Sequence, residues 1–119
     1  MNFELLDYTF NDESLKVDEN NLIINSIKDF NNLGIKLSDE VIDDNYFNNH
    51  LLLKVIFFDG SLPKRTLKSL NYDSIEKTIT VKTNKEDLTF STMDYRMHYF
   101  VIKINKVDVK TIKLINNLE

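Results

Sequence analysis

Apolar and polar residues alternate in short runs that recur roughly every ten residues along the chain. Alternation of this kind is typical of β-strands, because successive side chains of a strand point to opposite faces of a sheet. Polar residues rich in Asn, Asp and Ser separate the runs and favour turns. The runs that we predict to be strands are 3–10, 22–24, 51–58, 64–70, 76–83, 88–93, 99–104 and 109–115.

Two of these runs are apolar enough to form the centre of a core. Residues 51–58 are apolar at every position except Lys54, so we expect a central strand buried on both faces. Residues 99–104 should direct apolar side chains to both sides of their sheet. One face would carry Phe100, Ile102 and Ile104, and the other would carry Tyr99 and Val101.

A hairpin is predicted in the C-terminal half. Residues 76–83 alternate, with Ile79 and Val81 on the inner face. A polar turn at 84–87 then leads into the run 88–93, which we expect to return beside the first strand.

Two further runs are less regular. In the run from Lys64 to Leu70, the leucines fit either a helix that begins near Pro63 or an edge strand, and we favour the strand. In the run 109–115, the apolar phase shifts near Lys110 and Thr111, which predicts a β-bulge there.

One short helix is expected from Ile27 to Leu33, where apolar residues recur at helical spacing. Ser26 followed by Asp29 resembles an N-terminal capping box, and Gly34 stands where a helix C-cap favours a left-handed residue. The following residues read as a loop up to Asn49, with a turn of helix at 39–42.

These elements predict a mainly β fold: an antiparallel β-sandwich or partly open barrel of about eight strands with one short helix. The 119 residues are enough for a single domain with its own core, and no linker or repeat divides residues 1–119. The chain has no cysteine, which excludes disulfides, thiolate metal sites and cysteine nucleophiles.

Charge is distributed unevenly. Residues 1–59 hold twelve acidic and four basic side chains, and residues 60–119 hold seven acidic and eleven basic ones, which gives −8 and +4 and a total of −4. One interpretation is that the two halves interleave in the sheets and form cross-strand ion pairs. The other is an acidic surface for a basic partner. Its centre would be Asp39, Glu40, Asp43 and Asp44.

Tyr46 and Phe47 follow this acidic run in a polar loop. An exposed aromatic pair with charged residues around it is typical of an interface anchor, so we predict that these six residues bind a partner.

Other functions find less support in the sequence. An acidic chain with only two arginines lacks the positive surface that nucleic-acid binding requires. No apolar run is long enough to span a bilayer, and no glycine-rich phosphate loop or metal-binding motif is present, so we expect no membrane insertion, cofactor or metal. The N-terminus as written has no secretion signal, which indicates the cytoplasm, or the cell envelope if a signal was removed.

One set of residues could support catalysis. Asp94, Arg96 and His98 alternate, so their side chains would lie on one face at the start of a strand. They could act as an acid/base site, or they could be a salt-bridged strand start with a half-exposed histidine.

Three segments carry a resemblance to a known family. They are Ile23 to Leu33, Tyr46 to Val55 followed by Gly60 and Pro63, and Tyr99 to Lys106. In their order, this chain resembles the PrcB-like C-terminal domain of bacterial lipoproteins and protease-complex subunits over roughly residues 20–115. The family's Pro-Thr-Gly-Gly-Tyr-like segment is replaced here by Pro-Lys-Arg-Thr at 63–66. The resemblance implies a non-enzymatic, β-rich accessory domain and transfers no catalytic residue.

From these observations we expect a non-enzymatic protein-binding or accessory module of a bacterial complex, present as a monomer. The alternative is a small acidic inhibitor or immunity-type protein that neutralises a basic partner.

Overall fold

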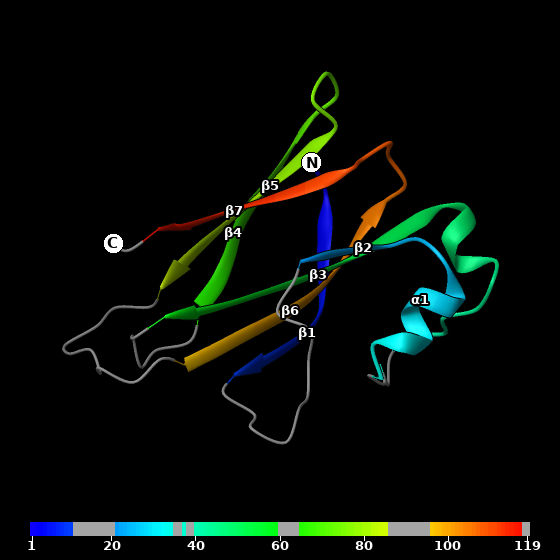
Figure 1. Cartoon of the computed structure of the whole chain (residues 1–119), viewed down its shortest axis with the longest axis horizontal. Helices are drawn as coiled ribbons and strands as arrows, with labels where there is room; N and C mark the ends of the chain where they lie inside the picture. Colours follow the sequence, from blue (N-terminus) through cyan, green and yellow to red (C-terminus); the bar gives the residue numbers. More distant parts are fainter. Residues whose placement is uncertain (11–20, 35–36, 38–39, 60–64, 86–95, 118–119) are drawn as a thin grey trace.

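A computed structural model describes residues 1–10, 21–34, 37, 40–59, 65–85 and 96–117. Within these ranges the chain forms seven strands in two sheets, one α-helix and one 3-10 helix (Figure 1). The predicted mainly β fold of the open sandwich type, with one short helix, is therefore confirmed, but the prediction that it is antiparallel throughout is wrong, because one strand pair of the smaller sheet is parallel. Among the described residues, no helix has the length and apolar character needed to cross a bilayer.

The larger sheet has four antiparallel strands in the order β1-β6-β3-β2. The two inner strands, β3 (His50–Asp59) and β6 (Arg96–Asn105), pair along their full length. The outer strands are β1 (Phe3–Phe10) and the short β2 (Leu22–Ile24). A register shift between Leu5 and Asp7 in β1 places an extra residue in that strand, which explains its irregular apolar period.

The smaller sheet has the order β4-β5-β7, with β4 (Arg65–Asp73), β5 (Thr78–Lys85) and β7 (Thr111–Asn117). β4 and β5 form an antiparallel hairpin, whereas β5 and β7 run parallel. The parallel pair arises because the chain leaves β6 and crosses to the other sheet before it forms β7.

The structure shows which elements the two irregular runs, 64–70 and 109–115, form. The described part of the run 64–70, from Arg65 on, is a strand, as we favoured, and it extends to Asp73. β7 begins at Thr111 and pairs with β5 without a register shift, so no bulge lies within the strand. At the start of the strand, Lys110 N and Thr111 N both donate to Lys77 O, which is the irregularity predicted there. The alternation of apolar and polar residues shifts by one position there because the chain passes from a loop into a strand.

The predicted hairpin partner 88–93 lies outside the described residues. In the structure, β5 pairs with β4 on one side and with β7 on the other. The predicted inner positions of β5 are confirmed, since Ile79 and Val81 are fully buried.

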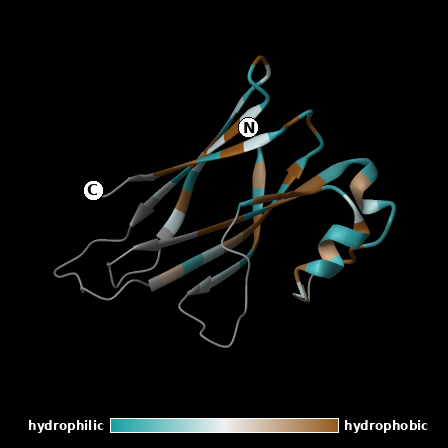
Figure 2. Ribbon diagram, in the orientation of Figure 1, coloured by the Kyte–Doolittle hydropathy of each residue, from teal (hydrophilic) through white to brown (hydrophobic). Residues whose placement is uncertain are grey.

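The main core lies between the two sheets. It is formed by alternate residues of β3, β5 and β6 and by one residue of β4: Leu51, Leu53, Val55, Leu70, Ile79, Val81, Phe100, Ile102 and Ile104. The predicted face of 99–104 is therefore confirmed. Figure 2 shows hydrophobic residues along β3, as expected for a strand whose two faces are both covered.

A third layer covers the other face of the four-stranded sheet. It contains α1 (Ile27–Asn32) and the 3-10 helix η1 (Tyr46–Asn48). The predicted capping is confirmed, because Ser26 Oγ accepts a hydrogen bond from Asp29 N at 3.1 Å. Gly34, with φ of +69°, ends the helical turn in the left-handed conformation. The apolar face of α1 buries Phe30 against the sheet.

The two layers outside the four-stranded sheet differ in charge. The three strands of the smaller sheet carry five basic residues and one acidic residue: Arg65, Lys68, Lys82, Lys85, Lys113 and Asp73. The opposite layer carries exposed Asp29, Asp43 and Asp44 and one exposed basic residue, Lys28. Opposite charges interleave across the strand pair β1–β6, where Glu4 and Lys103 lie 3.9 Å apart. In the outer layers, basic residues outnumber acidic ones on the smaller sheet and acidic residues outnumber basic ones on the opposite side.

Candidate functional site

The residues predicted to bind a partner lie on the segment 40–49, which we call the acidic loop. It leads from the α1 region to the start of β3 and lies on the outer face of the four-stranded sheet. The helical turn predicted at 39–42 does not form at residues 40–42, and a 3-10 helix forms at Tyr46–Asn48 instead. Asp39 lies outside the described residues.

Phe47 anchors the acidic loop to the sheet. Its side chain is only 4% exposed and belongs to the same apolar cluster as Leu52 and Val101. Lys106 Nζ donates a hydrogen bond to Phe47 O at 2.9 Å, and Lys106 N donates to Asn49 O at 2.9 Å. The expectation that Phe47 is exposed is therefore wrong, because the 3-10 turn directs the ring into the core.

Tyr46 is also part of the anchor. Its ring packs edge-on against Phe47, with centroids 5.3 Å apart, and Lys103 Nζ lies 5.5 Å from the ring centre. Its hydroxyl is buried without a hydrogen-bond partner among the described residues. Burial raises the pKa of Tyr46 well above its usual range, and the nearby carboxylates of Glu40 and Glu4 add to the effect. The predicted aromatic pair thus fixes the loop and does not project from it.

Glu40 has a structural contact as well. Its Oε1 lies 3.4 Å from Lys103 Nζ, and its side chain is only 18% exposed. Because Lys103 also approaches Glu4, it joins the loop to the strand pair β1–β6. A partly exposed pair of this kind contributes only about 1 kcal/mol, so its main effect is to fix the position of the loop.

Of the acidic-loop residues that face solvent, Val41, Asp43 and Asp44 bear most directly on partner binding. Val41 is 82% exposed, and Asp43 and Asp44 are exposed beside it. Asp43 Oδ1 accepts a hydrogen bond from Tyr46 N at 3.0 Å, which holds the start of the 3-10 helix. Our sequence reasoning missed Val41, although an apolar residue between acidic ones was a signal that could have found it.

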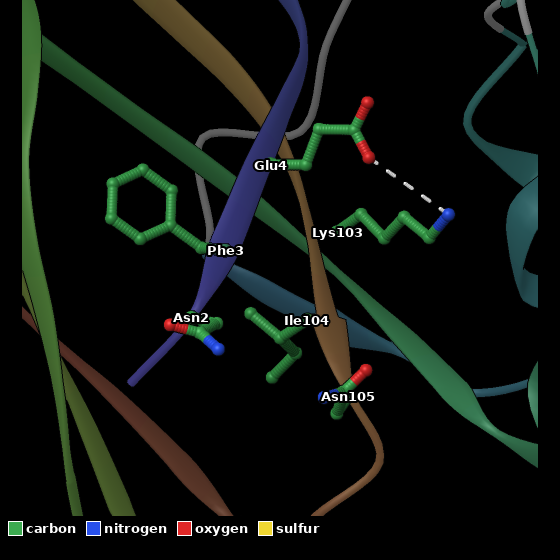
Figure 3. A pocket seen from close by; sticks show the side chains of 6 residues that line it. All are labelled: Asn2, Phe3, Glu4, Lys103, Ile104 and Asn105. Atoms are coloured by element: carbon green, nitrogen blue, oxygen red, sulfur yellow. Dashed lines mark ion pairs between the residues drawn. The ribbon is translucent and has the colours of Figure 1, made fainter.

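A small depression lies beside the loop contacts, between β1 and β6 (Figure 3). Its volume is about 190 Å³. Figure 3 shows Glu4 and Lys103 on neighbouring strands, joined by their ion pair. Pockets for small ligands usually measure about 300 to 1,000 Å³, so this depression does not support a small-molecule site. It is lined by Asn2, Phe3, Glu4, Lys103, Ile104 and Asn105.

The candidate acid/base residues are only partly described. His98 is fully buried on the inner face of the sheet, and its Nδ1 lies 2.9 Å from Tyr8 Oη. The expectation of a half-exposed histidine is wrong, because β1 and the core cover this position. Asp94 and the side chain of Arg96 lie outside the described residues. Within the described ranges, no group of three His, Cys, Asp or Glu residues could hold a metal ion.

A buried tyrosine under the third layer leads to a pH prediction. Tyr99 is 1% exposed, and its hydroxyl has no hydrogen-bond partner in the described structure. Burial, with a smaller effect from the Asp7 carboxylate, raises the pKa of Tyr99 to about 12.

Stability should therefore fall as the pH rises above 10. In the unfolded chain the hydroxyl ionises near pH 10, whereas in the folded chain it keeps its proton up to about pH 12, so alkali favours unfolding. We expect a loss of about 1 kcal/mol from this group between pH 9 and pH 11, measured by urea unfolding at the two pH values. The Tyr99→Phe variant should lose less stability over the same interval. Equal losses in the two proteins would contradict this assignment.

Comparison with known proteins adds no relative. No protein-family model, curated protein or solved structure matches this chain.

Proposed function

We propose that the protein is a non-enzymatic, protein-binding accessory module and that the acidic loop contacts its partner. One observation carries the proposal: an exposed apolar residue, Val41, lies beside two exposed carboxylates on a loop that is anchored to the sheet. An anchored loop loses little conformational entropy on binding, which favours affinity. The resemblance to PrcB-like accessory domains agrees with this role and remains a prediction.

The excess of acidic over basic residues on the layer that holds the acidic loop favours a second candidate, an acidic inhibitor or immunity-type protein. An inhibitor of this kind would act through the negative charge of the loop, and its affinity would fall steeply with salt. An accessory module that relies on Val41 would keep most of its affinity in salt, because burial of an apolar group is not weakened by screening.

The two candidates share one test. The protein is immobilised, exposed to lysate of its source cells, and the bound proteins are quantified by mass spectrometry. The variant Val41→Ser with Asp44→Asn should retain several-fold less of the specific partner than the wild type does. Asp43 is left unchanged because its carboxylate accepts a hydrogen bond from Tyr46 N at the start of the 3-10 helix.

The chain offers a matched control at the turn between β4 and β5. Ile75 is 90% exposed beside the exposed Glu76, and Asp73 Oδ1 holds this turn by accepting a hydrogen bond from Ile75 N at 2.9 Å. The variant Ile75→Ser with Glu76→Gln should retain the partner like the wild type. If both variants retain the same proteins in the same amounts, the acidic loop is not the binding surface.

A further inference from the structure

The four sheet edges of the described structure are not equally protected against pairing with another strand. The edge strands β1 and β4 each contain a register shift, and β2 has only three residues. Bulges and short lengths of this kind are how proteins discourage strand addition. β7 has neither feature, because its seven residues pair with β5 in a continuous register.

The outer edge of β7 presents unpaired backbone groups. Lys110 N and Thr111 N both donate hydrogen bonds to Lys77 O, at 2.8 and 3.3 Å, and Thr111 is the partner of Thr78 in the parallel register. In a parallel pair, a residue that donates to the carbonyl just before its partner directs its backbone groups toward the partner strand, so Thr111 and every second residue after it face β5. The backbone groups of Ile112 and Leu114 therefore point away from the sheet. Within the described residues, no strand pairs with this side of β7.

Apolar side chains near this edge are incompletely covered. Ile112 and Leu114 pack against the main core but remain only half-buried, and Ile23 of the neighbouring edge strand β2 is half-buried in the same way. An added strand with apolar residues on its inner face would remove more of this surface from water.

Charge indicates what kind of strand fits. Lys113 is the charged residue of β7, and the smaller sheet carries five basic residues and one acidic residue on its strands. A second copy of β7 fits poorly. If two copies paired antiparallel with Ile112 of each opposite Leu114 of the other, the two Lys113 side chains would lie opposite each other and repel. An acidic residue opposite Lys113 would be favourable.

We propose that the outer edge of β7 accepts an extended segment of a partner protein, with apolar residues over Ile112 and Leu114 and an acidic residue opposite Lys113. The added segment would continue the three-stranded sheet as a fourth strand. This surface is separate from the acidic loop. The inference shares one premise with the proposed function, namely that the partner is a protein.

The test uses nuclear magnetic resonance on the isotope-labelled full chain, titrated with a capped synthetic peptide of about seven residues that alternates valine and glutamate. We expect shifts and slower hydrogen exchange at the amides of Ile112 and Leu114. A matched peptide with lysine in place of glutamate should bind roughly tenfold more weakly, because it repels Lys113. Lys113→Glu should reverse this preference. Lys82→Glu on the central strand β5 should preserve the preference.

Three results would overturn the inference. The first is that no amide signal shifts at about 1 mM peptide. The second is that the shifted amides lie only in the acidic loop. The third is that the protein pairs with itself through β7 as its concentration rises. The Val41→Ser, Asp44→Asn variant should bind the peptide like the wild type. Failure of the acidic-loop proposal and failure of the edge proposal therefore give different results.

Discussion

Replacement of Phe47 by alanine should lower the free energy of unfolding by about 3 to 5 kcal/mol and release the acidic loop from the sheet. The ring is 4% exposed in the apolar cluster of the third layer, and Lys106 fixes its backbone carbonyl at 2.9 Å. Removing the ring costs its transfer free energy and leaves a cavity. Urea unfolding monitored by circular dichroism measures the change.

Two comparisons identify the cause of that loss. Phe47→Leu keeps most of the apolar volume and should cost about 1 kcal/mol. In Phe47→Ala, the amide of Asn49 should exchange faster with solvent, because the end of the loop is no longer fixed. A loss below about 1 kcal/mol for Phe47→Ala would mean that the ring is not buried against the sheet.

Replacement of Phe100 by alanine should have a comparable effect through the other face of the sheet. Phe100 is fully buried between the two sheets, and its ring stacks on Tyr8 with centroids 4.7 Å apart. The expected loss is about 3 to 5 kcal/mol, of which the aromatic contact contributes about 1 kcal/mol. Urea unfolding of the purified variant measures it.

The two core variants should differ in function. Under conditions where both remain folded, Phe100→Ala should keep the partner because the acidic loop is unchanged, whereas Phe47→Ala should lose it. Ile75→Ala, at a position that is 90% exposed, should change stability by less than about 0.5 kcal/mol and serves as the control. Equal stability of Phe100→Ala and Ile75→Ala would contradict the packing of the two sheets.

Much of the fold could be predicted because local patterns agree with tertiary packing. The run 51–58, apolar at every position except Lys54, requires two covered faces, and the structure supplies one layer on each side of β3. The α1 helix carries its own capping signals at Ser26 and Gly34. The parallel pairing of β5 with β7 had no such signal, because strand direction depends on where a loop crosses the core.

The candidate site could be predicted only in part. The sequence shows that acidic and aromatic residues are neighbours in the loop, but the orientation of each side chain depends on a turn that no periodicity encodes. The 3-10 helix directs Phe47 inward, and Lys103, far away in the sequence, binds Glu40. Three of the predicted binding residues, Glu40, Tyr46 and Phe47, therefore hold the loop in place, and Val41 is the exposed apolar residue.

The most direct test of the proposed function is photo-crosslinking in the source cells, with a photoreactive amino acid at position 41 or, as a control, at position 75. Both side chains are more than four-fifths exposed, at 82% and 90%, so the reactive group is equally accessible. We predict a discrete protein adduct from position 41 that is absent from position 75 and weakened by Asp44→Asn. The same adducts from both positions, or none from position 41, would contradict a partner-binding acidic loop.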